Sequence, residues 1–346
     1  MLPGIESATS PVVGATWVTN ANRRDGLART GEYEQSESAM TTIRLGAFPP
    51  LQGAGLVPDT QAEFVRLAAD AGLDHVCTGD HVSFFVGAGF DGLVSATSLL
   101  AVHPTMPVSV AVYLLPLRHP TLVARQIADL ELLAPGRLTL GVGIGGEDPH
   151  EYEVCGIDPR TRGRRMDECL TVVRELMTGK PVTFHGEFFD LDDALIAPAP
   201  RVPVPLIVGG RSDAAVRRAA LHGDGWIGIW NSARRFAEVT ASIDEQATAA
   251  GRLDHPRAHA MQVWCGIAPR RDQARTLVAS AMEGFYQLPF ERFERYSPSG
   301  TPAEVAEFLA PYVAAGCTTF NLIPQSPDMA TAVDGAAEVK RLLAEV

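Results

Sequence analysis

Short segments rich in β-branched residues alternate with amphipathic segments from residue 42 to the end of the chain. In the amphipathic segments apolar residues recur at spacings of three and four, as at Phe64, Leu67 and Ala71, which is the period of a helix with one buried face. This alternation is typical of βα units around a parallel sheet. The predicted strands are Ile43–Phe48, His75–Thr78, Val108–Leu115, Leu138–Val142, Leu206–Val208, Trp226–Ile229, Ala260–Cys265 and Thr319–Ile323.

Eight βα units fit a closed barrel better than an open, doubly wound sheet, which usually has fewer strands. The predicted fold class is therefore α/β, a (β/α)8 TIM barrel with small insertions. Two connections are long: Thr183–Pro205, whose pattern predicts a small hairpin, and Ala281–Pro302, which is rich in Phe and Tyr. In such a barrel we expect the active site at the carboxyl ends of the strands.

Residues 1–41 have a different composition, dominated by Gly, Ser, Thr, Asn and Glu, and lack the apolar segment of a secretory signal. We expect residues 1–41 to form a flexible tail and residues 42–346 to form one barrel domain. Met40 stands just before the first predicted strand, so it is a candidate native start beside Met1.

Composition excludes several classes of protein. The chain has 29 Lys+Arg against 41 Asp+Glu, a net charge of −12, and 46% hydrophobic residues. It therefore lacks the basic surface that nucleic acid requires, is too apolar to be disordered, and has no membrane-spanning run. Its five cysteines contain no CxxC pair, which argues against a disulfide framework and for a reducing, cytoplasmic compartment.

The second predicted strand ends in Gly79-Asp80-His81. A carboxylate beside a group that titrates near neutrality is typical of a positioned acid or base, so Asp80 and His81 are the catalytic candidates. One alternative is that Asp80 caps the loop and His81 packs as a satisfied polar residue. Another is a zinc site with His75 and Cys77, which is disfavoured because His75 begins the strand, at the end opposite the expected site.

Gly209-Gly210-Arg211-Ser212 joins the fifth predicted strand to a helix predicted over Asp213–Leu221. Small residues let backbone N–H groups approach a phosphate, which a helix N-terminus also favours, and Arg211 adds positive charge. The structural alternative is a tight turn with a Ser or Asp N-cap.

Gly141, Gly143 and Gly146 match the G-x-G-x-x-G pattern of dinucleotide-binding folds. That motif opens directly into a helix, whereas Glu147-Asp148-Pro149 follows here and the next helix is predicted near Gly163. We instead expect Gly141 and Gly143 to leave room for a flat ligand at the strand end.

Two further clusters have two interpretations each. Arg160, Arg162, Arg164 and Arg165 precede Asp167 and Glu168, which is typical of a solvated helix start with local ion pairs, although they also suit an anionic cofactor tail. Phe285, Tyr286, Phe290, Phe293 and Tyr296 form either a lid over an apolar substrate or ordinary packing in a core or dimer contact.

With these residues in view, the chain resembles the bacterial luciferase-like monooxygenase superfamily, in particular its coenzyme F420-dependent oxidoreductase branch. The similarity runs from Ile43 to Leu343. The motifs that carry it are Thr78-Gly79-Asp80-His81, Arg118-His119-Pro120 to Arg125-Gln126, Pro135-Gly136-Arg137-Leu138, Gly141-Val142-Gly143, Arg162-Gly163-Arg164-Arg165-Met166-Asp167-Glu168, Phe184-His185-Gly186-Glu187-Phe188-Phe189 and Val208-Gly209-Gly210 through Gly223-Asp224-Gly225-Trp226.

The resemblance implies a flavin or deazaflavin, F420 or alternatively FMN, bound at the strand ends with its phosphate on the loop from Gly209 to Ser212. It implies that Asp80 and His81 flank the ring, with His81 as proton donor or acceptor. It also implies a non-proline cis peptide near Val112-Tyr113-Leu114 behind the ring, and a homodimer. The expected cofactor-binding residues are Asp80, Val112, Tyr113, Gly141, Gly143, Ile144, Gly209, Gly210, Arg211 and Ser212.

The chain departs from the sugar-phosphate dehydrogenases that it resembles. Those enzymes have a glutamate where this chain has Ile144, and a tryptophan after the histidine where it has Phe84 and Phe85. We therefore expect a more apolar substrate pocket, with Phe84, Phe85 and Trp230 among its walls.

The predicted function is hydride transfer between reduced F420 and a small, mostly apolar carbonyl or enone. The alternatives are an FMN-dependent monooxygenase that uses O2 and a separate flavin reductase, a metal-dependent barrel hydrolase, and a cofactor-binding protein without catalysis.

Overall fold

The computed structural model describes residues 42–49, 58–87, 89–146, 148–252 and 258–345. The chain divides into the units Met1–Met40 and Thr41–Val346. The predicted tail and the candidate start at Met40 lie outside the described residues, which all belong to the second unit.

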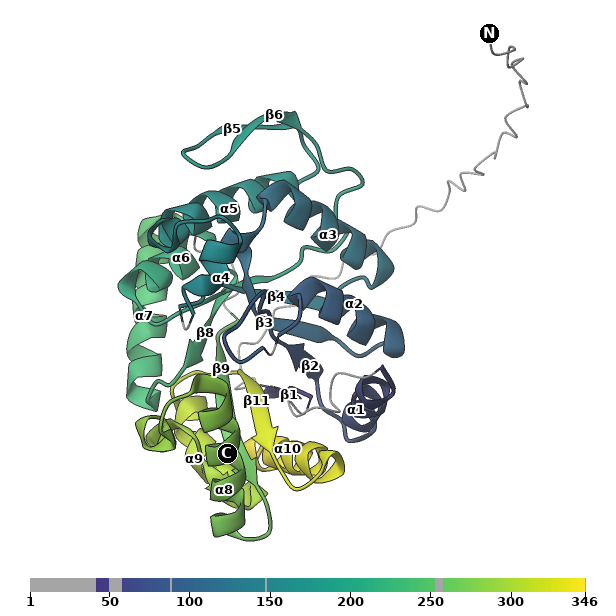
Figure 1. Ribbon diagram of the computed structural model, residues 1–346, viewed down its shortest axis with the longest axis vertical. Coiled ribbons are helices and arrows are strands. Elements are labelled where there is room, and N and C mark those ends of the chain that lie inside the picture. Colours follow the sequence, from purple (N-terminus) through teal and green to yellow (C-terminus); the bar gives the residue numbers. More distant parts are fainter. Residues whose placement is uncertain (1–41, 50–57, 88, 147, 253–257, 346) are drawn as a thin grey trace, which may run out of the picture. The chain divides into compact units, whose positions relative to one another are not determined.

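Eight parallel strands form a closed barrel in the second unit (Figure 1), which confirms the predicted fold class. Their order is β9-β11-β1-β2-β3-β4-β7-β8, and pairing of β8 with β9 closes the barrel. The strands are β1 (Arg44–Ala47), β2 (His75–Thr78), β3 (Val108–Leu114), β4 (Leu138–Gly143), β7 (Leu206–Gly209), β8 (Gly225–Ile229), β9 (Ala260–Ile267) and β11 (Thr319–Gln325). All eight predicted strands are present, with ends within two residues of the prediction.

Helices follow the strands and surround the barrel (Figure 1). They are α1 (Pro58–Asp70), α2 (Gly92–Val102), α3 (Pro120–Leu133), α4 (His150–Val154), α5 (Arg162–Leu176), α6 (Asp213–His222), α7 (Ala233–Ala249), α8 (Arg271–Tyr286), α9 (Pro302–Ala314) and α10 (Met329–Leu343). Single 3-10 turns lie at η2 (Leu115–Leu117), η3 (Pro159–Thr161), η4 (Phe290–Arg292) and η5 (Glu294–Tyr296). No helix in the described part of the chain combines the length and apolar composition that crossing a bilayer requires.

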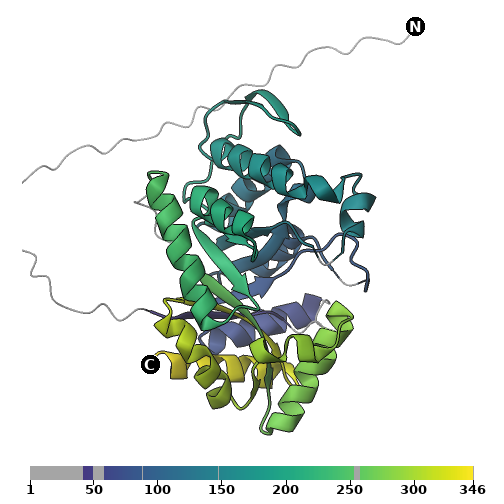
Figure 2. The same ribbon diagram turned by 90° about the vertical axis from the view of Figure 1, so that its left-hand side faces the viewer.

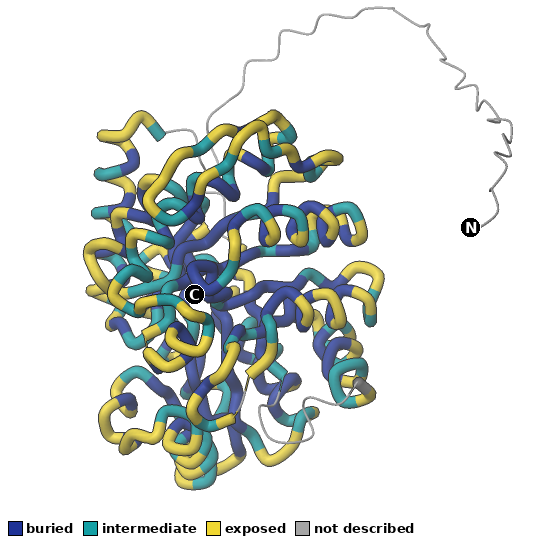
Figure 3. Tube along the Cα trace, turned by 45° about the horizontal axis from the view of Figure 1, so that its top comes forward, coloured by how far each residue is buried: buried dark blue, intermediate teal, exposed yellow. Residues whose placement is uncertain are grey.

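The core has two layers because successive side chains of a strand point to opposite faces. In β9, Ala260 and Trp264 belong to the cluster inside the barrel, whereas Met261 and Val263 belong to the larger cluster between strands and helices. Buried positions accordingly follow the strands in Figure 3. This alternation also points Gln262 into the barrel.

The two long connections adopt different structures. β5 (Val182–His185) and β6 (Asp190–Ala194) form the predicted antiparallel hairpin. The hairpin packs on α3 and α5, as Figures 1 and 2 show, through a small cluster that includes Val182. The second connection contains the end of α8, η4, η5 and β10 (Ser299–Gly300), a two-residue strand that pairs with β9 and that the sequence pattern did not predict.

One short helix was also missed. We predicted that the first helix after β4 starts near Gly163, but α4 precedes α5, which begins at Arg162. Because α4 starts at His150, seven residues after β4 ends at Gly143, the G-x-G-x-x-G match does not open directly into a helix, as predicted.

Candidate functional site

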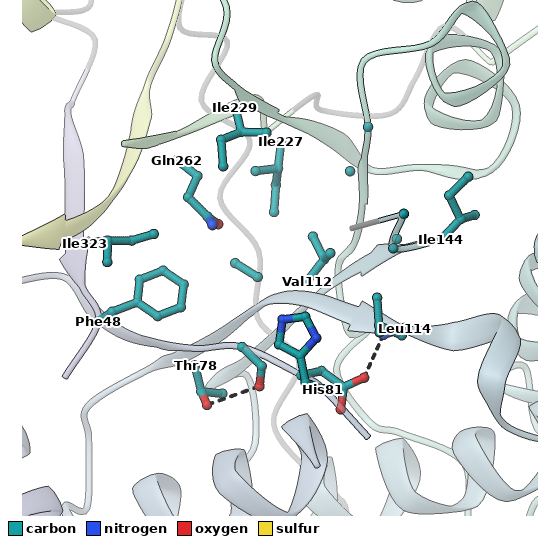
Figure 4. Close-up of a pocket in the computed structure, with 18 of the residues that line it drawn as sticks. Phe48, Thr78, His81, Val112, Leu114, Ile144, Ile227, Ile229, Gln262 and Ile323 are labelled. Atoms are coloured by element: carbon teal, nitrogen blue, oxygen red, sulfur yellow. Dashed lines mark hydrogen bonds between the residues drawn. The ribbon is translucent and has the colours of Figure 1, made fainter. Parts of the chain in front are cut away.

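A cavity of about 620 Å³ lies at the carboxyl ends of the barrel strands. Its volume is in the range of small-molecule sites, and its walls are largely apolar. Figure 4 shows Phe48, Val112, Ile227 and Ile323 around it, with the His81 ring and the Gln262 amide pointing inward. The cavity is therefore where a TIM barrel places its chemistry.

His81 stands on the wall of this cavity, in the loop between β2 and α2. Its Nδ1 atom lies 3.0 Å from Oε2 of Glu151, and its ring stacks on Phe84 with centroids 4.0 Å apart. Its Nε2 atom makes no hydrogen bond to any part of the chain that the structure describes. The His81 side chain is 19% exposed, so the ring is held on one edge and open on the other.

Glu151 on α4 is a site residue that sequence reasoning missed. The carboxylate is buried and also accepts hydrogen bonds from the backbone N–H of Val82 at 2.7 Å and of Ser83 at 3.4 Å. Burial acts to raise the pKa of Glu151, but the hydrogen bonds from His81 and the loop outweigh it and hold the pKa below its ordinary value. Seventy residues separate Glu151 from His81, so no local pattern marks the pair.

Asp80 also lines the cavity, but the chain itself binds both of its carboxylate oxygens. Its Oδ1 accepts from Gly92 N–H and from Nη2 of Arg118, and its Oδ2 accepts from Leu114 N–H and from Nη1 of Arg118. Burial raises the pKa of the Asp80 carboxyl, and the charge and hydrogen bonds of Arg118 oppose that rise. Four donors thus occupy its four acceptor positions, which favours a role in positioning the loop over a role as proton carrier.

The non-proline cis peptide lies between Ala111 and Val112 in β3, at the start of the segment where the resemblance placed it. Val112 lines the cavity and lies over two glycines, since a Cβ at Gly143 would come within 2.6 Å of Val112 and a Cβ at Gly209 within 2.9 Å. Gly143 itself lines the cavity, and its lack of a side chain leaves room for Val112 beside it. Gly141 does not line the cavity and instead packs under Ile227.

Tyr113 points to the other side of the sheet. Its ring is fully buried and lies under the Arg118 guanidinium, 4.4 Å from ring centroid to Cζ. Tyr113, expected to bind the cofactor, is not among the residues that line the cavity. Ile144, by contrast, lines the cavity as expected.

The loop Gly209-Gly210-Arg211-Ser212 lines the cavity along all four residues. Gly210 has φ +131, and its carbonyl accepts a 2.8 Å hydrogen bond from the indole of Trp226. Ser212 caps α6 by accepting from Ala215 N–H at 3.3 Å. The loop is therefore both a tight turn with a Ser N-cap and part of the cavity wall, so the two interpretations of this segment describe one structure. The N-terminus of α6 points toward the cavity.

Aromatic side chains close one side of the cavity. Trp230, Phe285 and Tyr286 line it, as expected for a lid, whereas Phe290 and Phe293 are buried in the core. Tyr296 lines a second, smaller hollow beside it. Both interpretations of the aromatic cluster thus apply, each to different members.

Phe84 and Phe85 do not stand where we expected them. Phe84 is buried beneath the His81 ring and is not on the cavity wall, and Phe85 is 46% exposed and lines the second hollow. The loop after β2 turns the two side chains away from the cavity, so of the three expected substrate-pocket residues Trp230 alone is on its wall.

The side chains of the zinc alternative do not converge. His75 binds Asn321 through Nε2 at 2.7 Å, Cys77 is buried in the inner cluster, and Asp80 is bound to Arg118. Within the described residues no three His, Cys, Asp or Glu side chains are grouped as metal ligands would be.

Two members of the basic run before and within α5 form ion pairs, but not with the expected partners Asp167 and Glu168. Arg160 pairs with Asp158 at 2.8 Å and Arg164 with Glu187 at 2.5 Å, both on the surface. The exposure of both pairs agrees with a solvated helix start. Asp167 instead pairs with Arg218, and Glu168 accepts from Glu187 N–H in the hairpin turn.

A family model described as luciferase-like monooxygenase matches residues 40–298. The chain belongs to the luciferase-like monooxygenase family. An uncharacterised protein of Mycobacterium tuberculosis is 37% identical over 170 residues, which cover 49% of this chain and 58% of that protein. The match thus spans less than two thirds of that relative.

Longer matches within the family are more distant. An F420-dependent glucose-6-phosphate dehydrogenase of Kineococcus radiotolerans is 29% identical, covering 75% of this chain and 86% of that protein, and one of Beutenbergia cavernae is 31% identical, covering 66% and 69%. A solved F420-dependent secondary alcohol dehydrogenase, in complex with an F420-acetone adduct, superimposes with a TM-score of 0.77 at 24% identity over 87% of this chain and 99% of that one. At that identity the superposition shows a shared fold.

Proposed function

We propose that this luciferase-like protein is an F420-dependent oxidoreductase that transfers a hydride between the reduced deazaflavin and a small, mostly apolar carbonyl or enone. The observation that carries the proposal is the His81 imidazole, held at one edge and open at Nε2 toward an apolar cavity at the strand ends. The two F420-dependent relatives, at 29% and 31% identity, support the choice of cofactor.

The residues present fit a cofactor with a flat ring and an anionic tail. Gly209 and Gly210 bring backbone close to the cavity without side chains, and the N-terminus of α6 and the Arg211 guanidinium favour a phosphate there. Val112 and Ile144 would contact the ring as apolar walls. When bound, the reduced deazaflavin supplies the hydride, and the protein supplies position and electrostatics.

The proton that accompanies the hydride is assigned to His81. Its Nε2 is the titratable position on the wall that has no hydrogen bond within the described residues, and imidazole exchanges protons near neutral pH. Phe48, Trp264 and Ile323 line the cavity nearby and exclude water from the reacting atoms.

The apolar walls favour a carbonyl or enone over a sugar phosphate. Ile144 stands on the wall at the position where the resemblance places a glutamate in sugar-phosphate dehydrogenases. The Gln262 amide is the neutral polar group that Figure 4 shows pointing inward across from His81, and it suits a hydrogen bond to one polar atom of such a substrate.

We also propose a cytoplasmic homodimer. The candidate contacts with a partner are two exposed apolar side chains, Val94 on α2 at 66% and Leu122 on α3 at 65%.

A second candidate is an FMN-dependent monooxygenase that uses O2 and a flavin reductase as partner. Its support is a pyrimidine monooxygenase of Allorhizobium ampelinum that is 30% identical over 237 residues, covering 66% of this chain and 56% of that protein. Under this second candidate, the same cavity and phosphate loop would hold FMN in place of F420.

One assay separates the two candidates. Purified protein with reduced F420 and a panel of enones and aldehydes is followed anaerobically by the absorbance of the oxidised deazaflavin. The F420 proposal expects substrate-dependent oxidation of the cofactor without oxygen. Oxygen consumption with reduced FMN, and no anaerobic turnover with F420, would favour the monooxygenase instead.

A further inference from the structure

Glu151 binds the loop that carries His81 at three points. Oε2 faces Nδ1 of His81 at 3.0 Å, and Oε1 accepts from Val82 N–H at 2.7 Å and from Ser83 N–H at 3.4 Å. The Glu151 side chain is 4% exposed. A buried carboxylate is stable only when hydrogen-bond donors pair with its oxygens. The carboxylate of Glu151 therefore requires the three donors from His81, Val82 and Ser83 at their observed positions.

The helix that carries Glu151 is itself fixed. α4 has only five residues, and Tyr152, which follows Glu151 in this helix, anchors it. The Tyr152 hydroxyl donates to the Ile144 carbonyl at 2.5 Å, and the Tyr152 ring packs on Leu114 and Leu117. Glu151 is therefore held against both the cavity loop after β4 and the end of β3. Its carboxylate stands at a defined position relative to His81.

One face of the imidazole and the Cβ of His81 are also packed against neighbours. Phe84 stacks on one face with an interplanar angle of 26°. Gly89 lies against the His81 Cβ, because a Cβ added at Gly89 would come within 2.5 Å of it. The Nδ1 edge of the ring thus contacts Glu151, and the Nε2 edge faces the cavity.

We propose that Glu151 is the positioning residue that holds His81 in the tautomer protonated at Nδ1, so that His81 accepts and donates the reaction proton at Nε2. An ionised carboxylate is an acceptor only, and therefore Nδ1 must be the donor of their hydrogen bond. This inference deepens the proposed function and rests on it for its catalytic consequence. The tautomer itself follows from the contacts alone.

The proton balance of carbonyl reduction follows from this arrangement. His81 enters the step as imidazolium, with Nδ1–H bound to Glu151 and Nε2–H directed at the carbonyl oxygen. As the carbonyl carbon gains the hydride, the C=O π bond breaks, the oxygen takes the Nε2 proton and an alcohol forms. The reduced cofactor is oxidised, and His81 is left neutral in the tautomer that Glu151 selects. Alcohol oxidation is the reverse.

Glu151→Gln changes the tautomer without changing the shape of the side chain. The amide oxygen takes over the hydrogen bonds from Val82 and Ser83, and the amide NH2 then faces Nδ1, which must become an acceptor. His81 is thereby forced to carry its proton at Nε2 when neutral. The matched control is Glu153→Gln on the same helix, whose side chain is 62% exposed and contacts His150 at 3.5 Å.

The test is 15N NMR of histidine-labelled protein, recorded at a pH at which the His81 15N shifts are those of a neutral imidazole, with the His81 signals assigned from His81→Gln. We expect the Nδ1–H tautomer in the wild type and Glu153→Gln, and the Nε2–H tautomer in Glu151→Gln. We also expect kcat to fall at least about tenfold in Glu151→Gln, with KM and cofactor affinity nearly unchanged.

An Nε2–H tautomer in the wild-type protein would overturn the proposal, even if Glu151→Gln does not fold. So would a Glu151→Gln protein that keeps the Nδ1–H tautomer or the wild-type kcat. The NMR measurement needs no cofactor, so a wild-type protein with the expected tautomer but no F420 turnover would refute the proposed function and leave the assignment of Glu151 standing.

Discussion

The guanidinium of Arg118 binds both oxygens of the Asp80 carboxylate, with Nη1 2.5 Å from Oδ2 and Nη2 2.7 Å from Oδ1. Asp80 is fully buried at its side chain, and Arg118 also reaches Asp91, the N-cap residue of α2, at 2.9 Å. This pair joins the loop after β2 to the end of β3 and to the start of α2. His81 therefore follows a residue that is fixed from three directions.

Arg118→Met should destabilise the protein, because it leaves the buried Asp80 carboxylate without its counter-charge. Removing one partner of a buried ion pair costs about 3–5 kcal/mol. We expect the free energy of unfolding, measured by urea titration, to fall by about 3 kcal/mol. Arg234→Met is the control, since Arg234 is 85% exposed and pairs with Glu238 at the surface at 2.7 Å, and it should change stability little. Equal stability of the two variants would contradict this role for Arg118.

His81→Gln should lower turnover and leave cofactor binding nearly intact. Loss of a general acid typically slows a reaction by about 10²–10⁴-fold. Steady-state kinetics with F420 and an active carbonyl substrate measure kcat, and a fluorescence titration measures the affinity for F420. Unchanged kcat would remove His81 from the reaction.

Gly210→Ala should weaken cofactor binding. Gly210 has φ +131, a conformation that L side chains rarely adopt, and a Cβ there would lie 2.7 Å from the Cβ of Ala215. The loop must shift, so we expect the Kd for F420 to rise by about tenfold or more, which corresponds to about 1.4 kcal/mol. Gly284→Ala in α8 is the control, because nothing lies within 4 Å of its added Cβ. If both variants bind like the wild type, the loop does not hold the cofactor.

Stability should fall in acid partly through His75. Burial lowers the pKa of His75 from 6.5 to about 4, and the hydrogen bond to Asn321 opposes this only in part. The unfolded chain therefore takes up the proton first as pH falls, so the contribution of neutral His75 is complete above pH 6.5 and is lost progressively toward pH 4. Between about pH 7 and about pH 5 the loss amounts to about 2 kcal/mol.

Urea unfolding of wild type and His75→Gln at those two pH values tests this prediction. The variant should lose less stability than the wild type on acidification. His185→Gln, which replaces a histidine whose side chain is 73% exposed, should behave like the wild type. An equal acid sensitivity in all three proteins would show that His75 does not titrate as its burial requires.

The barrel was predictable from the sequence because its signals are local. Each strand is a run of apolar residues that can be recognised from those residues alone. The four residues Gly209-Gly210-Arg211-Ser212 likewise predict both a tight turn and the start of a helix. His81 was found in the same way, as a titratable group at a strand end. These predictions needed no knowledge of which segments meet in space.

The rest of the site depends on contacts between distant segments. Glu151 lies in a five-residue helix too short to show a hydrophobic period, and its partner His81 is 70 residues away. Asp80 is a proton-carrier candidate by type, and only the contact with Arg118, 38 residues on, shows that its acceptor positions are filled. Phe84 was placed on the pocket wall because it stands where the resemblance implies a tryptophan, whereas the loop after β2 turns it beneath the His81 ring.

The measurement that tests the central claim most directly is a fluorescence titration of the purified, cofactor-free protein with F420 and, separately, with FMN. The claim is that the cavity at the strand ends holds a deazaflavin, so saturation by F420 at micromolar or lower concentration is predicted, with no comparable binding of FMN. Saturation by FMN alone would contradict it and support the monooxygenase, and binding of neither would contradict both assignments.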